Sequence, residues 1–387
     1  MSDPPARRWT MLGLGLGAMI SGCAFQFGMP YLIPALRAEG LSLGEASLLV
    51  TCPMAGLLFT LIGWGVLADR RGERFVLGLG LGLAALFLAA AAAVDGTLPK
   101  GACLVLAGAA GASVHAASGR LILGWFAPTE RGLAMAIRQS AQPLGVAVGA
   151  AALPPLGAGG TGRALLALAG CCAVMGLLAG LFVHDPPPGP ARAGERTSSP
   201  YRTPVLWRLH TSAAFLVVPQ FAVATFALVY LVDARDWDPA PAGRLLAAVA
   251  VAGALARLGA GLWSDRVGSR LRPYRTLAVL IGAIMAALAL GAATGSPAAV
   301  AALLVAGVLT VSPNGLGTTA VAEYAGLSWA GRALGIQNTF QNVLSTATPP
   351  LLGGLIGATD YATAFAVAVA FPLLAVALIP MHAEHAP

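Results

Sequence analysis

Gly65-Val-Leu-Ala-Asp69-Arg70-Arg71-Gly72-Glu73-Arg74 is a short polar stretch between two long apolar runs. A second stretch, Gly261-Leu-Trp-Ser-Asp265-Arg266-Val-Gly268-Ser-Arg270, repeats its pattern of glycine, aspartate and arginine. Asp69 and Asp265 lie 196 positions apart in a chain of 387 residues, so each half of the chain carries one copy. The repeat predicts two similar halves that move against each other, which is how many secondary transporters are built.

The composition is typical of a membrane protein. Hydrophobic residues make up 57% of the chain and charged residues only 10%, whereas a soluble domain has about 25% charged residues. A net charge of +7 is compatible with nucleic-acid binding. The basic residues, however, lie in short clusters between apolar runs, which indicates orientation in a membrane instead. We therefore expect a lipid bilayer as a partner and no nucleic acid.

Runs of about 20 mostly apolar residues predict membrane-spanning helices. Twelve such runs occur, approximately over residues 9–36, 44–67, 75–94, 101–126, 132–157, 163–183, 207–232, 241–263, 274–293, 298–322, 332–357 and 361–380. Residues 184–206, between the sixth and seventh runs, are polar and rich in proline, which is typical of a linker. The sequence thus predicts an all-α membrane protein with two pseudo-symmetric six-helix bundles, residues 1–183 and 207–387.

The placement of arginine predicts the orientation in the membrane. If the N-terminus is inside, the cytoplasmic loops carry twelve arginines, and the opposite loops carry only Arg37, Lys100, Arg163 and Arg235. The positive-inside rule therefore places both termini and the linker in the cytoplasm. The first apolar run is longer than the region of about 7–15 residues found in a cleaved signal. We expect a multi-pass protein of the cytoplasmic (inner) membrane.

A second internal repeat supports the first. The segment Ala134-Met-Ala-Ile-Arg138-Gln139-Ser-Ala-Gln142 in the fifth run aligns with Ala333-Leu-Gly-Ile-Gln337-Asn338-Thr-Phe-Gln341 in the eleventh. The offset of 199 positions is close to the 196 of the first repeat, and it places His115 opposite Asn314. We infer an internal duplication with parallel topology.

The Gly-x-Leu-Ala-Asp-Arg-x-Gly-x-Arg pattern that starts at Gly65 resembles the signature loop of the major facilitator superfamily. The weaker copy at Gly261 and the six-plus-six layout agree with this resemblance, which covers almost the whole chain. It implies the twelve-helix fold of that family and transport by alternating access. Arg257, shortly before a Ser-Asp-Arg loop, also resembles the carboxylate and inorganic-anion branches of the superfamily.

Charged and amide side chains are costly inside a bilayer, so they normally face a cavity or a partner. The interiors of the third, sixth, ninth and twelfth runs contain none, and we expect these four helices to face lipid. The polar side chains of the other runs mark a candidate substrate site: Gln26, Tyr31, His115, Arg120, Arg138, Gln139, Gln142, Gln220, Arg257, Asn314, Gln337, Asn338 and Gln341.

Three of these residues, Arg120, Arg138 and Arg257, are expected roughly 10–12 Å inside the cytoplasmic boundary, at about 1.5 Å per residue. Few carboxylates are available to pair with them, because Glu323 and Asp233 lie near helix ends. We predict that the arginines bind an anionic substrate through paired hydrogen bonds. Alternatively, they bond helix carbonyls or extend to the interface, and the amides hold helices together.

The repeated loops are expected to act as a cytoplasmic gate. By the resemblance, Asp69 and Asp265 each lie at the N-terminus of a helix of the other bundle, where a carboxylate is favourable. The arginines bridge to neighbours such as Glu130, and the glycines permit close approach and tight turns. Such contacts favour the outward-open form. The gating candidates are Gly65, Asp69, Arg70, Gly72, Arg74, Glu130, Gly261, Asp265, Arg266 and Gly268.

The leading hypothesis is a secondary or facilitative transporter of a small organic anion, such as a monocarboxylate, in monomeric form. The alternative is a proton-coupled exporter of lipophilic cations or drugs, which usually needs a membrane carboxylate in the first half, and none is evident. His115, which titrates near neutral pH when unperturbed, and Glu323 are candidates for proton coupling. No cluster suits an enzyme, a metal or a cofactor, so we expect none of these.

Overall fold

The structure is a computed structural model that describes residues 5–117, 125–126, 134, 137–138, 140–185, 199–325 and 329–381. The described part of the chain is helical and contains no strand. The chain forms two compact units. The N-terminal unit is Met1–Ala191 with Pro239–Ala247, and the C-terminal unit is Arg192–Asp238 with Ala248–Pro387. The predicted boundaries of the bundles and linker stay predictions.

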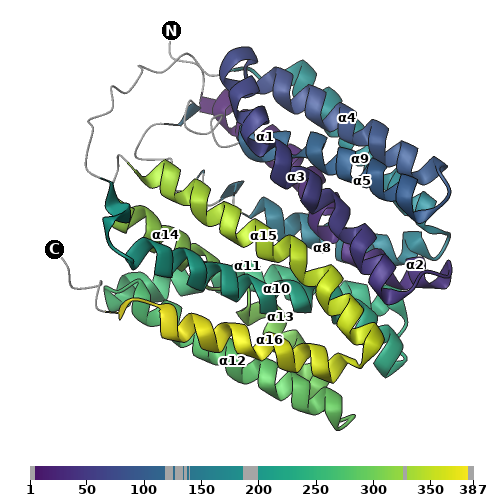
Figure 1. The fold of residues 1–387 in the computed structure, drawn as a ribbon. Helices are drawn as coiled ribbons and strands as arrows, with labels where there is room; N and C mark the ends of the chain where they lie inside the picture. The colour runs from purple at the N-terminus through teal and green to yellow at the C-terminus, as the bar shows by residue number, and fades with distance from the viewer. Residues whose placement is uncertain are drawn as a thin grey trace. The chain divides into compact units, whose positions relative to one another are not determined.

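The N-terminal unit consists of helices joined by short turns (Figure 1). They are α1 (Pro5–Gly28), the 3₁₀ helix η1 (Met29–Leu32), α2 (Ile33–Ala38), α3 (Leu43–Arg71), α4 (Glu73–Ala93), α5 (Thr97–Gly111), α8 (Ala141–Gly157) and α9 (Thr161–Phe182). The main pairs that pack in it are α4 with α9, α3 with α5, and α1 with α8.

The C-terminal unit is built in the same way. Its elements are the 3₁₀ helix η2 (Pro200–Arg202), α10 (Val205–Arg235), α12 (Leu271–Ala293), α13 (Ala298–Leu309), α14 (Asn314–Ala325), α15 (Ala330–Ala358) and α16 (Tyr361–Leu378). Helix α11 (Pro239–Val267) starts among residues that cluster with the N-terminal unit and continues into the C-terminal unit. Helix α10 is the most buried of the candidate membrane spans in the described residues, and it packs on both α15 and α16.

Glycines allow helices to pack backbone to backbone. A Cβ on Gly56 of α3 would clash with the carbonyl of Val105, and one on Gly108 of α5 would clash with that of Pro53. Close approach of this kind is typical of helices in lipid. The hydrophobic effect does not hold helices together there, so they associate by close van der Waals packing, which small residues permit. The abundant glycine of the sequence is thus used for packing.

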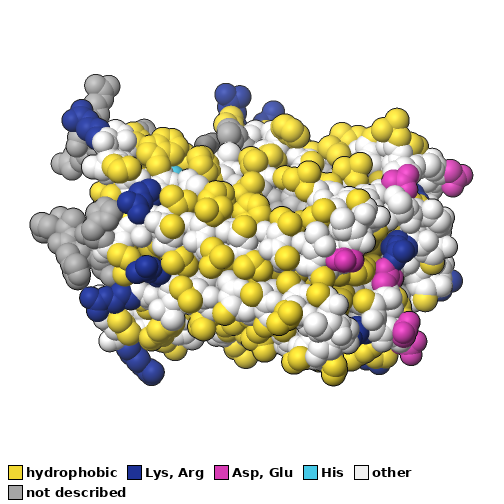
Figure 2. Space-filling model, turned by 60° about the horizontal axis from the view of Figure 1, so that its bottom comes forward, with side chains coloured by type: hydrophobic (Ala, Val, Ile, Leu, Met, Phe, Trp, Pro, Cys, Tyr) yellow, Lys and Arg dark blue, Asp and Glu magenta, His cyan; other side chains and the backbone are white. Residues whose placement is uncertain are grey.

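Ten helices in the described residues are long and apolar enough to cross a membrane. Figure 2 shows one face of the molecule, on which hydrophobic side chains are widespread and charged side chains are few. Two predicted runs fall outside this set. In the fifth, α8 is described over only 17 residues. The eleventh corresponds to α15, which carries the amides of Gln337, Asn338 and Gln341.

Three of the predicted single helices are interrupted, which is a correction to the sequence analysis. The run 9–36 divides into α1, η1 and α2, with Pro30 and Pro34 each near the start of a new helical segment. The run 101–126 breaks at Ala112, and helix resumes over residues 113–117. The run 298–322 breaks over residues 310–313, and Pro313 directly precedes α14. Proline explains two of these breaks, because it lacks the N–H that a continuous helix needs.

Candidate functional site

A polar cluster lies at the break in the N-terminal unit. Gln26 comes from α1, and His115 belongs to the short helical segment after the break at Ala112. The ring Nε2 of His115 lies 2.8 Å from Gln26 Oε1. Arg138 donates from Nη2 to the backbone carbonyl of His115 at 3.2 Å. The three side chains therefore meet at one point of the interrupted helix, and we call them the N-terminal triad.

Local packing fixes this arrangement. The Gln26 side chain is fully buried, and the ring of Phe27 packs edge-on against His115 with 6.3 Å between centroids. A Cβ on Gly111 would lie 2.8 Å from Gln26 Nε2, so glycine is needed just before the break. Gln26 Nε2 is buried and has no hydrogen-bond partner in the described residues.

The C-terminal unit contains a matching cluster. Asn314, the first residue of α14, donates from Nδ2 to Oε1 of Gln220 in α10 at 3.0 Å. Arg257 of α11 donates from Nε to the carbonyl of Val311, which lies in the break before α14, at 3.3 Å. The stem of Arg257 runs beside Gly315, where a Cβ would lie 3.7 Å from the arginine Cγ. We call Gln220, Asn314 and Arg257 the C-terminal triad.

The two triads correspond in two ways. In each, an amide of the unit's first long helix faces a polar side chain just after a helix break. In each, an arginine donates to a carbonyl at that break. A break leaves carbonyl groups without their helical donors, and arginine provides one. The arginines themselves come from non-equivalent helices, since the repeat aligns Arg138 with Gln337.

Arg257 keeps donors available for a ligand. A guanidinium has five N–H donors, and only the one on Nε has a hydrogen-bond partner among the described residues. No carboxylate in that part of the chain forms an ion pair with it. Asp233 instead accepts from the hydroxyl of Tyr361 at 3.0 Å, and Glu323 binds Arg270.

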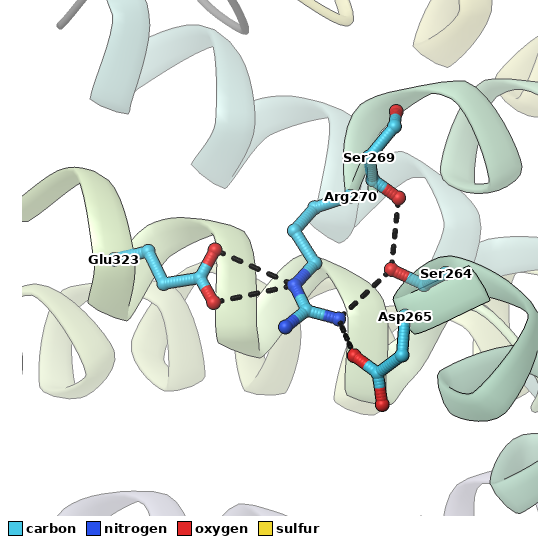
Figure 3. Close-up of polar contacts among 5 residues, drawn as sticks. All are labelled: Ser264, Asp265, Ser269, Arg270 and Glu323. Carbon is cyan, nitrogen blue, oxygen red and sulfur yellow. Dashed lines mark hydrogen bonds and ion pairs between the residues drawn. The ribbon is translucent and has the colours of Figure 1, made fainter. Parts of the chain in front are cut away.

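The second signature copy is held by Arg270 rather than by Arg266 (Figure 3). Arg270 donates from Nη1 to the carboxylate of Asp265 and, at 3.0 Å, to Ser264 Oγ. Its Nε donates to Glu323 of α14 at 3.2 Å. The hydrogen bond with Asp265 and the charge of Glu323 raise the pKa of Arg270. Arg266 is exposed.

Turn geometry and capping shape this second loop. Gly268 adopts a φ of +64° and ends α11 in the left-handed conformation that glycine favours. Ser264 Oγ donates to the carbonyl of Ser269 at 2.8 Å, and Ser269 Oγ accepts from the N–H of Arg272 at 3.1 Å. The serines that depart from the sequence pattern of the first copy thus hold the turn in place.

The first copy is fixed differently. Gly72 has a φ of +84° and separates α3 from α4. The N–H of Arg74 donates to Asp185 at 2.9 Å, and Arg74 Nε donates to the carbonyl of Gly180 at 2.7 Å. Asp185 therefore caps the N-terminus of α4, where glycine has no side chain to do so. Arg70 is exposed.

For several gating candidates the structure describes no contact. Glu130 and the side chain of Asp69 lie outside the described residues. In that described part, nothing lies within 4 Å of a Cβ placed on Gly65 or Gly261. Close helix contact within a unit therefore does not require either glycine, and the role of Asp265 toward the other bundle stays a prediction.

Comparison with known proteins identifies the family. The family model of the Major Facilitator Superfamily matches residues 14–349. The chain belongs to the major facilitator superfamily. The uncharacterized MFS-type transporter Rv2994 of Mycobacterium tuberculosis strain H37Rv is 43% identical over 378 residues, which cover 97% of this chain and 85% of the relative. The resemblance noted at Gly65 is thus confirmed.

Solved structures show the same transporter fold. A bacterial homolog of the human lysosomal transporter Spinster, inward-facing and occupied, has a TM-score of 0.81 at 15% identity, covering 98% of this chain and 97% of that one. A point mutant of the nucleoside transporter NupG has a TM-score of 0.76 at 14% identity, covering 96% of this chain and 99% of that one. The chain is therefore a multi-pass membrane transporter with the all-α fold of its family.

The remaining candidates of this transporter are dispersed. Tyr31 is buried in η1, Gln142 and Gln341 are half-buried, and Asn338 is exposed on α15. Gln337 is buried, and in the described residues neither its oxygen nor its nitrogen has a hydrogen-bond partner. Arg120 and Gln139 lie outside the described part of the chain.

Sequence reasoning missed three features of the site. Arg270 was not counted among the gating residues, although it is the last residue of the repeated signature. The pairing of Gln26 with His115 and of Gln220 with Asn314 was not predicted either. The signal for that pairing was available, because Gln26 and Gln220 lie 194 positions apart, close to the repeat offset.

Proposed function

We propose that this transporter carries a small organic anion, such as a monocarboxylate, across the cytoplasmic membrane by alternating access, and that Arg257 binds the anion. The observation that supports this most is a half-buried guanidinium that uses one donor on a helix carbonyl and forms no ion pair within the described residues. Charge inside a bilayer is costly and is retained where it serves a pathway. A carboxylate would both neutralise Arg257 and accept its remaining donors.

The topology belongs to the same proposal. We infer twelve spanning helices with both termini in the cytoplasm, six in each bundle, and a transporter that works as a monomer. Arg138, which donates to the carbonyl of His115, and the polar residues around it form the N-terminal part of the substrate site. The signature loops act as a cytoplasmic gate, and His115 serves as the first candidate for a coupling proton.

The anion hypothesis is tested by uptake into liposomes that contain the purified full-length transporter, over a panel of radiolabelled carboxylates. Replacing Arg257→Gln removes charge-assisted hydrogen bonds worth about 1.5–3 kcal/mol, so uptake should fall about 10- to 100-fold. Arg275→Gln is the matched control, because Arg275 is exposed at the start of α12, and its uptake should match the wild type.

The result separates the two candidate functions. Unchanged uptake by the Arg257→Gln variant, with normal folding in detergent, would overturn the role of Arg257. Transport of cationic dyes but of no carboxylate would overturn the anion hypothesis and favour the exporter. Repeating the uptake with and without a pH gradient shows whether a proton accompanies the substrate, and a His115→Gln variant shows whether that residue carries it.

A further inference from the structure

The hydrogen-bond pattern of Asn314 leaves one acceptor unused. An amide side chain has an oxygen that accepts and a nitrogen that donates. Asn314 donates from Nδ2 to Gln220 Oε1 at 3.0 Å. This bond orients the amide, and in the described residues its oxygen Oδ1 has no hydrogen-bond partner. The side chain is only partly buried.

The N-terminal triad has the same polarity. Gln26 Oε1 can only accept, so the contact of 2.8 Å places the proton of the neutral His115 ring on Nε2. The other ring nitrogen, Nδ1, then carries a lone pair. Since Gln26 is fully buried, it holds the ring in this orientation. Each unit therefore orients one neutral acceptor by means of an amide from its first long helix.

Each acceptor lies beside a guanidinium. Arg257 donates to the carbonyl of Val311, three residues before Asn314 on the same interrupted helix. Arg138 donates to the carbonyl of His115 itself. In each unit a neutral hydrogen-bond acceptor and a guanidinium thus belong to the same helix break.

We propose that the transported anion is a hydroxycarboxylate, whose hydroxyl group donates a hydrogen bond to Asn314 Oδ1 or His115 Nδ1 while its carboxylate binds the neighbouring arginine. This proposal rests on the anion-transport function proposed above and specifies its substrate. A neutral acceptor suits an O–H donor. An ammonium donor, as in an amino acid, would favour a carboxylate partner, and within the described residues no carboxylate bonds Asn314, Gln220 or Arg257.

The test compares matched pairs of acids that differ by one hydroxyl group. Binding to the purified full-length transporter is measured by thermal shift for lactate against propionate, glycolate against acetate, and 3-hydroxybutyrate against butyrate. One hydrogen bond of average strength corresponds to about a tenfold difference in dissociation constant. We expect the hydroxylated member of at least one pair to bind about tenfold more tightly.

Variants locate the acceptor. Asn314→Leu keeps a branched side chain but removes the oxygen, and the preference in that pair should fall to about one. If instead His115 is the main acceptor, His115→Phe abolishes the preference in the same way. Thr339→Val is the control, since Thr339 bonds only its own helix and is exposed, and it should keep the wild-type ratio.

The outcomes distinguish this proposal from the anion function. Equal binding of both members in every pair overturns the hydroxyl proposal and leaves the anion function in place. Binding of no member of any pair, with loss of carboxylate uptake, overturns both. A preference that survives in both Asn314→Leu and His115→Phe contradicts the assigned acceptors. The wild-type ratio decides the substrate class even if a variant does not fold.

Discussion

At the scale of single residues, Arg257 and Arg270 illustrate two uses of the same side chain. Arg257 donates to a helix carbonyl and forms no ion pair in the described part of the chain. Arg270 lies at the end of the C-terminal bundle and joins Asp265 and Glu323. The first arrangement leaves a positive charge available to a ligand, and the second uses the charge to join α11 and α14.

The network around Arg270 predicts a variant that impairs transport more than stability. Arg270→Gln should lower the uptake rate severalfold, because it releases the loop from α14. The ion pairs are largely exposed, so each contributes only about 0.2–1 kcal/mol to the free energy of unfolding. Uptake rates in liposomes and thermal unfolding in detergent measure the two effects.

Arg266→Gln is the matched control for this prediction, because Arg266 belongs to the same loop but is exposed and outside the network of Figure 3. It should transport faster than the Arg270→Gln variant. If the order of the two variants is reversed, Arg266 and not Arg270 controls the loop.

At the residue level, the sequence selected polar side chains that the structure places in contact, and their role in substrate binding stays a prediction. Arg257, Asn314, Gln26 and Gln220 were selected because polar groups are costly in lipid, and the structure brings them together in the two triads. Arg270 was missed because the signature contains two arginines and the pattern does not rank them. In the structure Arg270 follows the turn at Gly268 and bonds Glu323, whereas Arg266 is exposed at the end of α11.

At the scale of helices, the two triads lie at the breaks before residues 113 and 314. A continuous helix satisfies its own carbonyl groups, whereas a break leaves some of them to side chains. In the C-terminal unit the carbonyl of Val311 is bound by Arg257, and α14 starts with Asn314. Interrupted helices of this kind commonly form substrate sites in transporters.

We therefore predict that Pro313→Ala lowers transport without lowering thermal stability. Alanine supplies the N–H that proline lacks and favours helix by about 3 kcal/mol in a helix interior, so the break should shorten and thermal stability should stay equal or rise. Val311 would then bond along its own helix, Arg257 would lose its anchor, and uptake should fall at least about tenfold.

The matched control is Pro372→Ala, which changes a buried proline inside α16, far along the chain from the triad. That variant should keep its uptake. Wild-type uptake by Pro313→Ala, or an equal loss in both variants, would contradict the role of the break. Unfolding temperature and uptake are measured on the same preparations.

The sequence predicted where helices lie better than where they are interrupted. Hydropathy averages over a whole run, so a break of one to four residues does not lower it enough to be noticed. Pro313 was a visible signal, but the break at Ala112 had only the neighbouring Gly111, and glycine is frequent throughout this chain.

At the scale of the whole molecule, the duplication of the chain is the feature that the sequence predicted best. Two signature loops and two aligned polar segments indicated equivalent halves. The two triads contain equivalent contacts between an amide and a polar side chain. The arginines break the symmetry, since the repeat places Gln337 opposite Arg138. Each unit therefore keeps the amide of the repeat but differs from the other in the position of its arginine.

The charge asymmetry of the loops yields a prediction about topology. Arginines cluster where α3 meets α4 and where α11 meets α12. Asp95 lies between α4 and α5, and Asp236 lies between α10 and α11, at the other ends of α4 and α11. The positive-inside rule places the arginine-rich ends in the cytoplasm. Alkaline phosphatase, which is active only after export, should therefore be active when fused at Gly96 or Gly295 and inactive when fused at Ser199 or Gly268.

Immunoblots of the four fusions control for expression, because an inactive fusion is informative only if the protein is present. Both glycines at the expected outer side lie in turns with positive φ, where an insertion avoids helix interiors. Activity at Gly268 or Ser199 would reverse the orientation and place both termini outside. Activity at only one outer position would instead show that the two halves differ in orientation. That result would contradict the parallel duplication on which the correspondence of the two triads rests.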